Sequence, residues 1–218
     1  MVNNKHAFWQ ALIITIVIFW TGIMLGVLFE SSRADKLEKI YFNAETDIFD
    51  IQLESDLLTL LDADCEIATK GTIDFADQIY KEAKTLEKYD ASTRITEEII
   101  DIHKRYDLLR TMLWKNTIEL QEKCPSTTNS IVYLYEYNNP ATNTQAKQIT
   151  FSKVLSDAKT KYGDKIILIP IAYDTGVKSL DLFKKTYDLD KAPIIIINQE
   201  DIIKEIPTVE MIEKYLKL

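Results

Sequence analysis

The sequence predicts a membrane-anchored α + α/β protein with an N-terminal transmembrane helix, a helical region and a C-terminal α/β domain. An uncharged apolar segment lies near the N-terminus, and a long stretch after it carries apolar residues at helical spacing. From residue 130 on, β-branched runs alternate with helical segments. We expect a tail at 1–6, a transmembrane helix at 7–29, helices at 30–124, a linker at 125–129 and the last domain at 130–218.

The N-terminal segment has the length and composition of a membrane anchor. No charged residue occurs between Ala7 and Phe29, and at 1.5 Å per residue this segment spans about 35 Å. A cleaved signal peptide is the alternative, but its apolar region is usually only about 7–15 residues long. We expect a single-pass anchor in the cell membrane with the C-terminal domain outside the cytoplasm. The positive-inside count, with Lys5 before the segment and three basic residues soon after it, favours the opposite orientation.

Residues 32–124 have the pattern of long helices. A first helix would run to Gly71, a second from a Thr72 cap to about Tyr89, and a third from a Ser92 cap. Short connections favour a helical hairpin or three-helix bundle. The same apolar seam would also suit a coiled coil between two copies of the chain. That seam recurs at steps of seven, at Leu37, Ala44, Ile51, Leu58 and Cys65.

The last domain has the element order β-α-β-α-β-β-α. We expect the first three strands to be parallel, because helices connect them. A tight turn at 199–201 should make the last two strands antiparallel. The strands are expected at 130–137, 165–173, 193–198 and 202–206, and the helices at 143–162, 179–187 and 207–216.

Two segments of this domain carry a family resemblance. Glu136-Tyr137-Asn138-Asn139-Pro140-Ala141 follows the first strand, and Tyr187-Asp188-Leu189-Asp190-Lys191-Ala192-Pro193 leads into the third. With the element order, they resemble the thioredoxin fold, which carries Glu-Trp-Cys-Gly-Pro-Cys and Tyr-Gly-Ile-Arg-Gly-Ile-Pro at these places. The resemblance implies that Pro193 is the family's cis-proline, facing the active-site turn and helping to dock extended peptides.

The departure from the family pattern bears directly on activity. Asn138 and Ala141 stand where the family has its two redox cysteines, and neither supplies the thiolate that disulfide exchange needs. We therefore expect a non-enzymatic, membrane-tethered binding or scaffold protein. The alternatives are a divergent thiol–disulfide oxidoreductase or chaperone-like peptide-docking protein, and a homo-oligomeric coiled-coil element. The candidate docking residues are Tyr137, Asn138, Asn139, Pro140, Ala141, Ala192 and Pro193.

The two cysteines, Cys65 and Cys124, lie outside that domain. We place them at the far ends of the first and third helices, where an up-down-up arrangement would bring them together as a structural disulfide. Two separate buried thiols are the alternative. A disulfide would place the domain outside a reducing cytoplasm.

The charge and composition of the chain limit the classes of binding partner that we expect. Residues 30–218 hold all 34 acidic residues, and the whole chain has a net charge of −8, which disfavours nucleic acid. We expect a membrane and a protein partner, including a homodimer, and neither a metal nor a cofactor. His103, set among charged residues, is expected on the solvated surface without a functional role.

Overall fold

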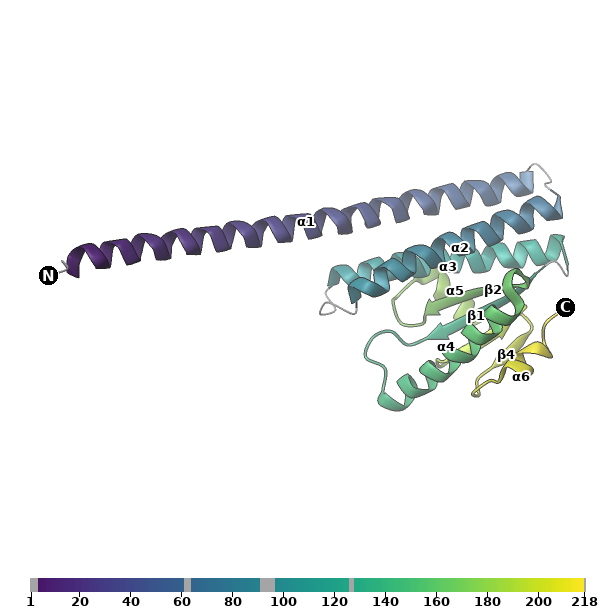
Figure 1. Cartoon of the computed structure of the whole chain (residues 1–218). Helices are drawn as coiled ribbons and strands as arrows, with labels where there is room; N and C mark the ends of the chain where they lie inside the picture. Colours follow the sequence, from purple (N-terminus) through teal and green to yellow (C-terminus); the bar gives the residue numbers. More distant parts are fainter. Residues whose placement is uncertain (1–3, 61–63, 91–96, 126–127, 218) are drawn as a thin grey trace. The chain divides into compact units, whose positions relative to one another are not determined.

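Figure 1 shows the computed structural model of the chain, which describes residues 4–60, 64–90, 97–125 and 128–217. These residues form helices and one small mixed sheet. The chain divides into two compact units, Met1–Thr46 and Asp47–Leu218, and helix α1 (Asn4–Leu60) contributes to both. This division does not test the boundaries expected at residues 30, 125 and 130, which stay predictions.

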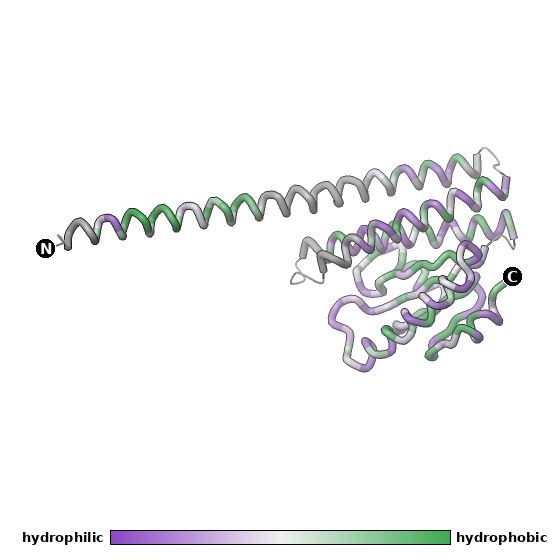
Figure 2. The backbone as a smooth tube through the Cα atoms, viewed as in Figure 1, coloured by the Kyte–Doolittle hydropathy of each residue, from purple (hydrophilic) through white to green (hydrophobic). Residues whose placement is uncertain are grey.

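The Met1–Thr46 unit contains a helix that is long and apolar enough to cross a membrane. The candidate span is Phe8–Phe29, with 22 residues and a mean hydropathy of 2.6, and Figure 2 shows the hydrophobic run along this part of α1. At 1.5 Å per residue it is about 33 Å long, close to the thickness of the hydrocarbon core. A signal sequence has similar composition, so the uncleaved anchor stays a prediction.

Two long helices follow in the second unit, α2 (Cys65–Asp90) and α3 (Glu97–Lys123), and they pack against each other. Asp64 caps α2, because its Oδ1 accepts a hydrogen bond from the Ile67 backbone N–H at 2.9 Å. The predicted helix end at Gly71 is therefore wrong. Gly71 lies inside α2, and the Thr72 hydroxyl donates to the Ala68 carbonyl instead of capping a new helix. The expected cap Ser92 lies outside the described residues.

A disulfide joins Cys65 to Cys124, as predicted. The helices involved differ from the expectation, since Cys65 is the first residue of α2 and not part of the first helix. Cys124 follows the end of α3. The start of α2 meets the end of α3 because these two helices are antiparallel neighbours. The bond closes a loop with a sequence separation of 59.

The sheet has four strands in the order β2-β1-β3-β4. β1 pairs with β2 in parallel and with β3 in antiparallel orientation, and β3 pairs with β4 in antiparallel orientation. The prediction that the third strand is parallel to the first is therefore wrong, whereas the antiparallel last pair is confirmed. The strands are β1 (Asn129–Tyr135), β2 (Ile166–Ala172), β3 (Ile194–Ile197) and β4 (Asp201–Ile203).

The lengths of the two connecting helices explain the direction of β3. Helix α4 (Thr142–Tyr162) has 21 residues and carries the chain back about 31 Å, far enough to start β2 parallel to β1. Helix α5 (Lys178–Thr186) has only nine. The chain after it remains near the end of β2, because the Tyr173 hydroxyl donates to the Leu189 carbonyl at 3.0 Å. β3 therefore begins at the end of the sheet at which β2 ends, and it runs antiparallel to β1.

Helices cover both faces of the sheet (Figure 1). Ile195 and Ile197 of β3 belong to the core under α4 and the short α6 (Val209–Glu213). Ile194 and Ile196, which alternate with them, point to the opposite face. All four isoleucines are fully buried, as the run of β-branched residues predicted. From α4 the core receives Phe151, Leu155 and Ala158, whereas Ile149 is exposed.

Helix α3 is buried on two sides. One apolar row is buried along it, and so is a second row that packs toward the sheet and α5. The first row comprises Ile102, Tyr106, Leu109, Leu113 and Leu120. In the second row the Trp114 indole stacks on the Phe183 ring with centroids 4.1 Å apart. These contacts join α3 to the sheet, so the described residues do not support the expected bundle or coiled coil. The second row comprises His103, Asp107, Arg110, Trp114 and Thr117.

Two polar contacts hold α3 at opposite ends of the strands of the sheet. Near its C-terminal end, Gln121 Nε2 donates to Asn198 Oδ1 at 3.0 Å, just after β3. Near its N-terminal end, Asp107 accepts from the backbone N–H of Ala172, the last residue of β2. The second contact lies at the edge where the candidate site is found.

Candidate functional site

The site predicted from the sequence is the turn between β1 and α4, and Asp174 holds it in place. Asp174 lies just after β2, and its two carboxylate oxygens accept from the backbone N–H groups of Tyr137 and Asn138, each at 2.8 Å. The Asn138 side-chain amide donates to the Asp174 carbonyl at 3.0 Å. The two N–H groups of the turn therefore already bind a carboxylate of the same chain.

The other side of the turn is held by α4. The Gln148 side chain accepts from the Glu136 backbone N–H at 2.8 Å and donates to the Glu136 carbonyl at 3.1 Å. Asn138, Asn139 and Ala141 are exposed, whereas Tyr137 and Pro140 are half-buried. The exposed part of the turn is thus small and polar, on a backbone fixed from two sides.

Helix α4 begins after this turn and not within it. Its N-cap is Ala141, which provides no side-chain cap. Asn138, which the resemblance aligns with the first cysteine of the thioredoxin fold, lies three residues before the cap. The N-terminus of a helix is one of the features that lower a cysteine pKa, and Asn138 lacks it.

Ala192 and Pro193 lie at the same edge of the sheet as the turn. The Ala192–Pro193 peptide bond is cis, and the register that pairs Leu134 with Ile194 places Pro193 beside the end of β1. Both residues are buried. A peptide at this edge would therefore meet the exposed residues 138, 139 and 141 before it met the Ala192 or Pro193 side chain.

His103 belongs to this site, so its expected place on the solvated surface is wrong. Its side chain is buried, and its ring lies on the Tyr137 ring with centroids 4.0 Å apart. The periodicity of α3 carried the missed signal. His103 is spaced at steps of four, three and four from Asp107, Arg110 and Trp114, which describes a second buried face.

A buried carboxylate lies one helical turn further along α3. Asp107 is fully buried, and its oxygens accept from Ala172 N at 3.0 Å and Thr175 Oγ1 at 2.8 Å. The Arg110 guanidinium lies 3.4 Å away. Burial raises the pKa of the Asp107 carboxyl above its ordinary value, and the Arg110 charge is the main opposing influence. These contacts fix the loop that carries Asp174, so Asp107 positions the turn indirectly.

The disulfide lies far from this site. His103 contacts the turn near the start of α3, and Cys124 follows the other end of the helix. The sequence separation of 20 between His103 and Lys123 corresponds to about 30 Å along the helix axis. Neither cysteine is therefore placed to exchange a disulfide at the turn.

Among the described residues, no group of three or more His, Cys, Asp or Glu side chains is arranged to hold a metal ion. The site thus offers two exposed asparagine side chains, a stacked His103–Tyr137 pair and a closed carboxylate clamp. Such groups suit hydrogen bonding and docking better than bond cleavage.

Comparisons with protein-family models, with curated proteins and with solved structures give no match.

Proposed function

We propose that this chain is a membrane-tethered, non-enzymatic binding or scaffold protein whose thioredoxin-like domain has lost its dithiol. The observation that carries the proposal is the separation of the only two cysteines from the turn. They are bonded to each other at the opposite end of α3, about 30 Å away. The turn itself holds Asn138 and Ala141, and Asp174 occupies its backbone N–H groups.

Two features support the thioredoxin-like assignment of residues 130–218. The elements follow the order expected from the resemblance. Helix α4 links β1 to β2, α5 links β2 to β3, and β4 and α6 come last. A cis-proline precedes β3 at the edge where the β1–α4 turn lies. The later start of α4 departs from the family and fits a turn that no longer needs to activate a thiol.

The disulfide supports an extracytoplasmic domain, because disulfides persist in oxidising compartments. The N-terminus then lies in the cytoplasm and the single span crosses the cell membrane. Alkylation of intact cells with a membrane-impermeant maleimide tests this orientation. We expect both cysteines to be labelled only after reduction. Labelling that needs cell lysis but no reductant would place the domain in the cytoplasm.

The absence of enzymatic activity is tested by disulfide reduction. The full chain in detergent is mixed with insulin and dithiothreitol, and insulin precipitation is followed by turbidity. We expect the natural chain to give the same rate as the C65S/C124S variant and as buffer. A faster rate with the natural chain, lost in the variant, would establish the divergent oxidoreductase instead.

The thioredoxin-like geometry is tested by restoring the dithiol. We expect the N138C/A141C variant to form a disulfide within the turn on mild oxidation, seen as the loss of two thiols. The matched control is A146C/I149C, two exposed positions of α4 with the same spacing. Its Cβ atoms are about 5–6 Å apart, too far for a disulfide. Equal behaviour of the two variants would contradict the resemblance.

A further inference from the structure

A row of exposed apolar side chains runs along the part of α1 that belongs to the Asp47–Leu218 unit. Phe49, Leu53 and Leu57 are 65 %, 56 % and 40 % exposed. Their spacing of four residues places them on one face of the helix over about 12 Å. No described element covers this row. Three anchors at such spacing match the apolar side of an amphipathic helix.

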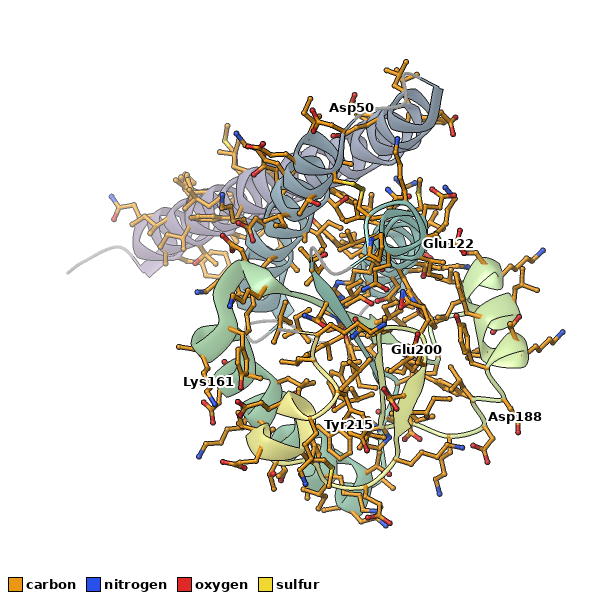
Figure 3. The ribbon with its side chains drawn as sticks, turned by 90° about the vertical axis from the view of Figure 1, so that its right-hand side faces the viewer. Asp50, Glu122, Lys161, Asp188, Glu200 and Tyr215 are labelled. Carbon is orange, nitrogen blue, oxygen red and sulfur yellow. A yellow bond between two sulfur atoms is a disulfide. The ribbon has the colours of Figure 1, made fainter. Side chains whose placement is uncertain are left out.

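Carboxylates flank the row. Asp50 and Glu54 lie on one side of it and Asp56 on the other, and all three are exposed. Figure 3 labels Asp50, whose side chain points away from the body of this unit. Partial burial, together with the charges of Asp50 and of Asp74 on α2, raises the pKa of Glu54. The charges of Asp50 and Asp74 therefore repel the charge of Glu54.

The sequence around the row has the same one-sided charge. Residues 40–69 contain eight Asp or Glu residues and no Lys or Arg. Among the described residues, Asp50, Glu54 and Asp56 form no ion pair.

The negative charge beside the apolar row favours one kind of binding partner over the others that an exposed apolar helix face could bind. A second copy in the same orientation would bring its own carboxylates against these, and like charges oppose such pairing. An anionic lipid surface would be repelled for the same reason. A segment that carries lysine or arginine beside its apolar side would meet both the apolar row and the carboxylates.

We propose that the α1 face formed by Phe49, Leu53, Leu57, Asp50 and Glu54 docks a cationic amphipathic helix of a protein partner. This face is separate from the β1–α4 turn. The proposal therefore names a second surface and holds whether or not the turn is inactive in disulfide exchange.

The probe is a labelled, soluble 18-residue helical peptide of alanine and lysine with one row of three leucines. Binding to the full chain in phosphatidylcholine nanodiscs is measured by fluorescence anisotropy, with empty nanodiscs as the blank. A second peptide with glutamate in place of lysine has the same apolar row. We expect saturable, salt-sensitive binding of the lysine peptide alone. No binding of the lysine peptide, or equal binding of both peptides, would overturn the proposal.

The apolar half of the face is tested with F49S/L53S. Both positions are exposed, so the fold should tolerate the change, and hydrogen exchange of the Asp47–Leu218 unit checks this. We expect about tenfold weaker binding or more, because two anchors lose their apolar contact. The matched control is I149S/L182S, with positions exposed by 65 % and 68 % on α4 and α5. An equal loss in the control would show non-specific adhesion and overturn the proposal.

The acidic half is tested with D50N/E54Q, and the control E122Q/E205Q removes the same two charges from exposed positions elsewhere. We expect D50N/E54Q to weaken binding several-fold and to reduce its salt dependence, while the control has little effect. Equal effects would mean that only net charge matters. Sedimentation of the natural chain supplies the remaining arm, since a dimer lost in F49S/L53S would make a second copy the occupant.

Discussion

Opening the Cys65–Cys124 disulfide should destabilise the Asp47–Leu218 unit by an amount that its loop length predicts. The bond closes a loop of 59 residues. In the chain-entropy model, this loop removes about 14 cal/mol/K from the unfolded state, or about 4 kcal/mol at 25 °C. Many folded domains have a free energy of unfolding of only about 5–15 kcal/mol. Loss of this bond should therefore remove a large part of the stability of the unit.

The assay is guanidinium unfolding of the full chain in detergent, with W9F/W20F as background so that Trp114 alone reports. Trp114 is fully buried against the Phe183 ring and should be a sensitive probe of α3. We expect reduction to lower the midpoint by about 1 M. C65A/C124A, unfolded without reductant, separates loop closure from side-chain packing. A change below about 1 kcal/mol in both experiments would refute the loop-closure argument.

Three further perturbations test the packing and the electrostatics. Burial holds the pKa of Asp107 above its unfolded value, so the folded state keeps this proton to higher pH. The free energy of unfolding of the natural chain should therefore fall relative to D107N as pH rises from about 4 to 8, measured by denaturation at each pH, and a rise would contradict the sign. W114A should cost about 3–5 kcal/mol in the same assay, because Trp114 is fully buried, and a cost below about 1 kcal/mol would contradict its place in the core. A Cβ at Gly71 would lie 2.6 Å from Glu54 Oε1, the end of a flexible side chain. G71A should therefore be neutral or raise Tm, with a gain of up to about 1 kcal/mol in this helix interior, and a clear loss would show that Glu54 cannot move aside.

Local patterns in the sequence predicted the strands and helices of residues 129–216 well. The run Ile194–Ile197 is β-branched throughout, and this composition alone favours a buried strand. The direction of that strand depends on where the chain lies at the end of the nine-residue helix α5. That outcome is decided by tertiary contacts such as the Tyr173–Leu189 hydrogen bond, which no local pattern encodes.

The start of α2 was missed because Gly71 seemed a better helix end than Asp64 a helix start. The N-cap bond from Asp64 to Ile67 and the packing of α2 on α3 offset the cost of a glycine inside the helix. The cysteine pair was still predicted, because Cys65 and Cys124 each lie near the end of a helix in both the predicted and the observed assignment.

The candidate site was predicted only in part. The turn residues 137–141 and Pro193 were named from the sequence, and the register places them at one edge. Asp174, Asp107 and His103 were missed, because each acts through a partner distant in sequence. His103 meets Tyr137, and Asp107 meets Thr175, 68 residues away. Charged neighbours in the sequence favoured a solvated position for His103, although α3 packs on two sides.

The disulfide also has a mechanical consequence for the membrane tether proposed above. If the anchor and the C-terminal residues are pulled apart, tension enters the closed loop at Cys65 and leaves it at Cys124. The 59-residue interval then cannot lengthen, which withholds about 200 Å of contour length even after every other contact has broken. The oxidation state of one bond thus sets the maximum end-to-end length of the extended chain.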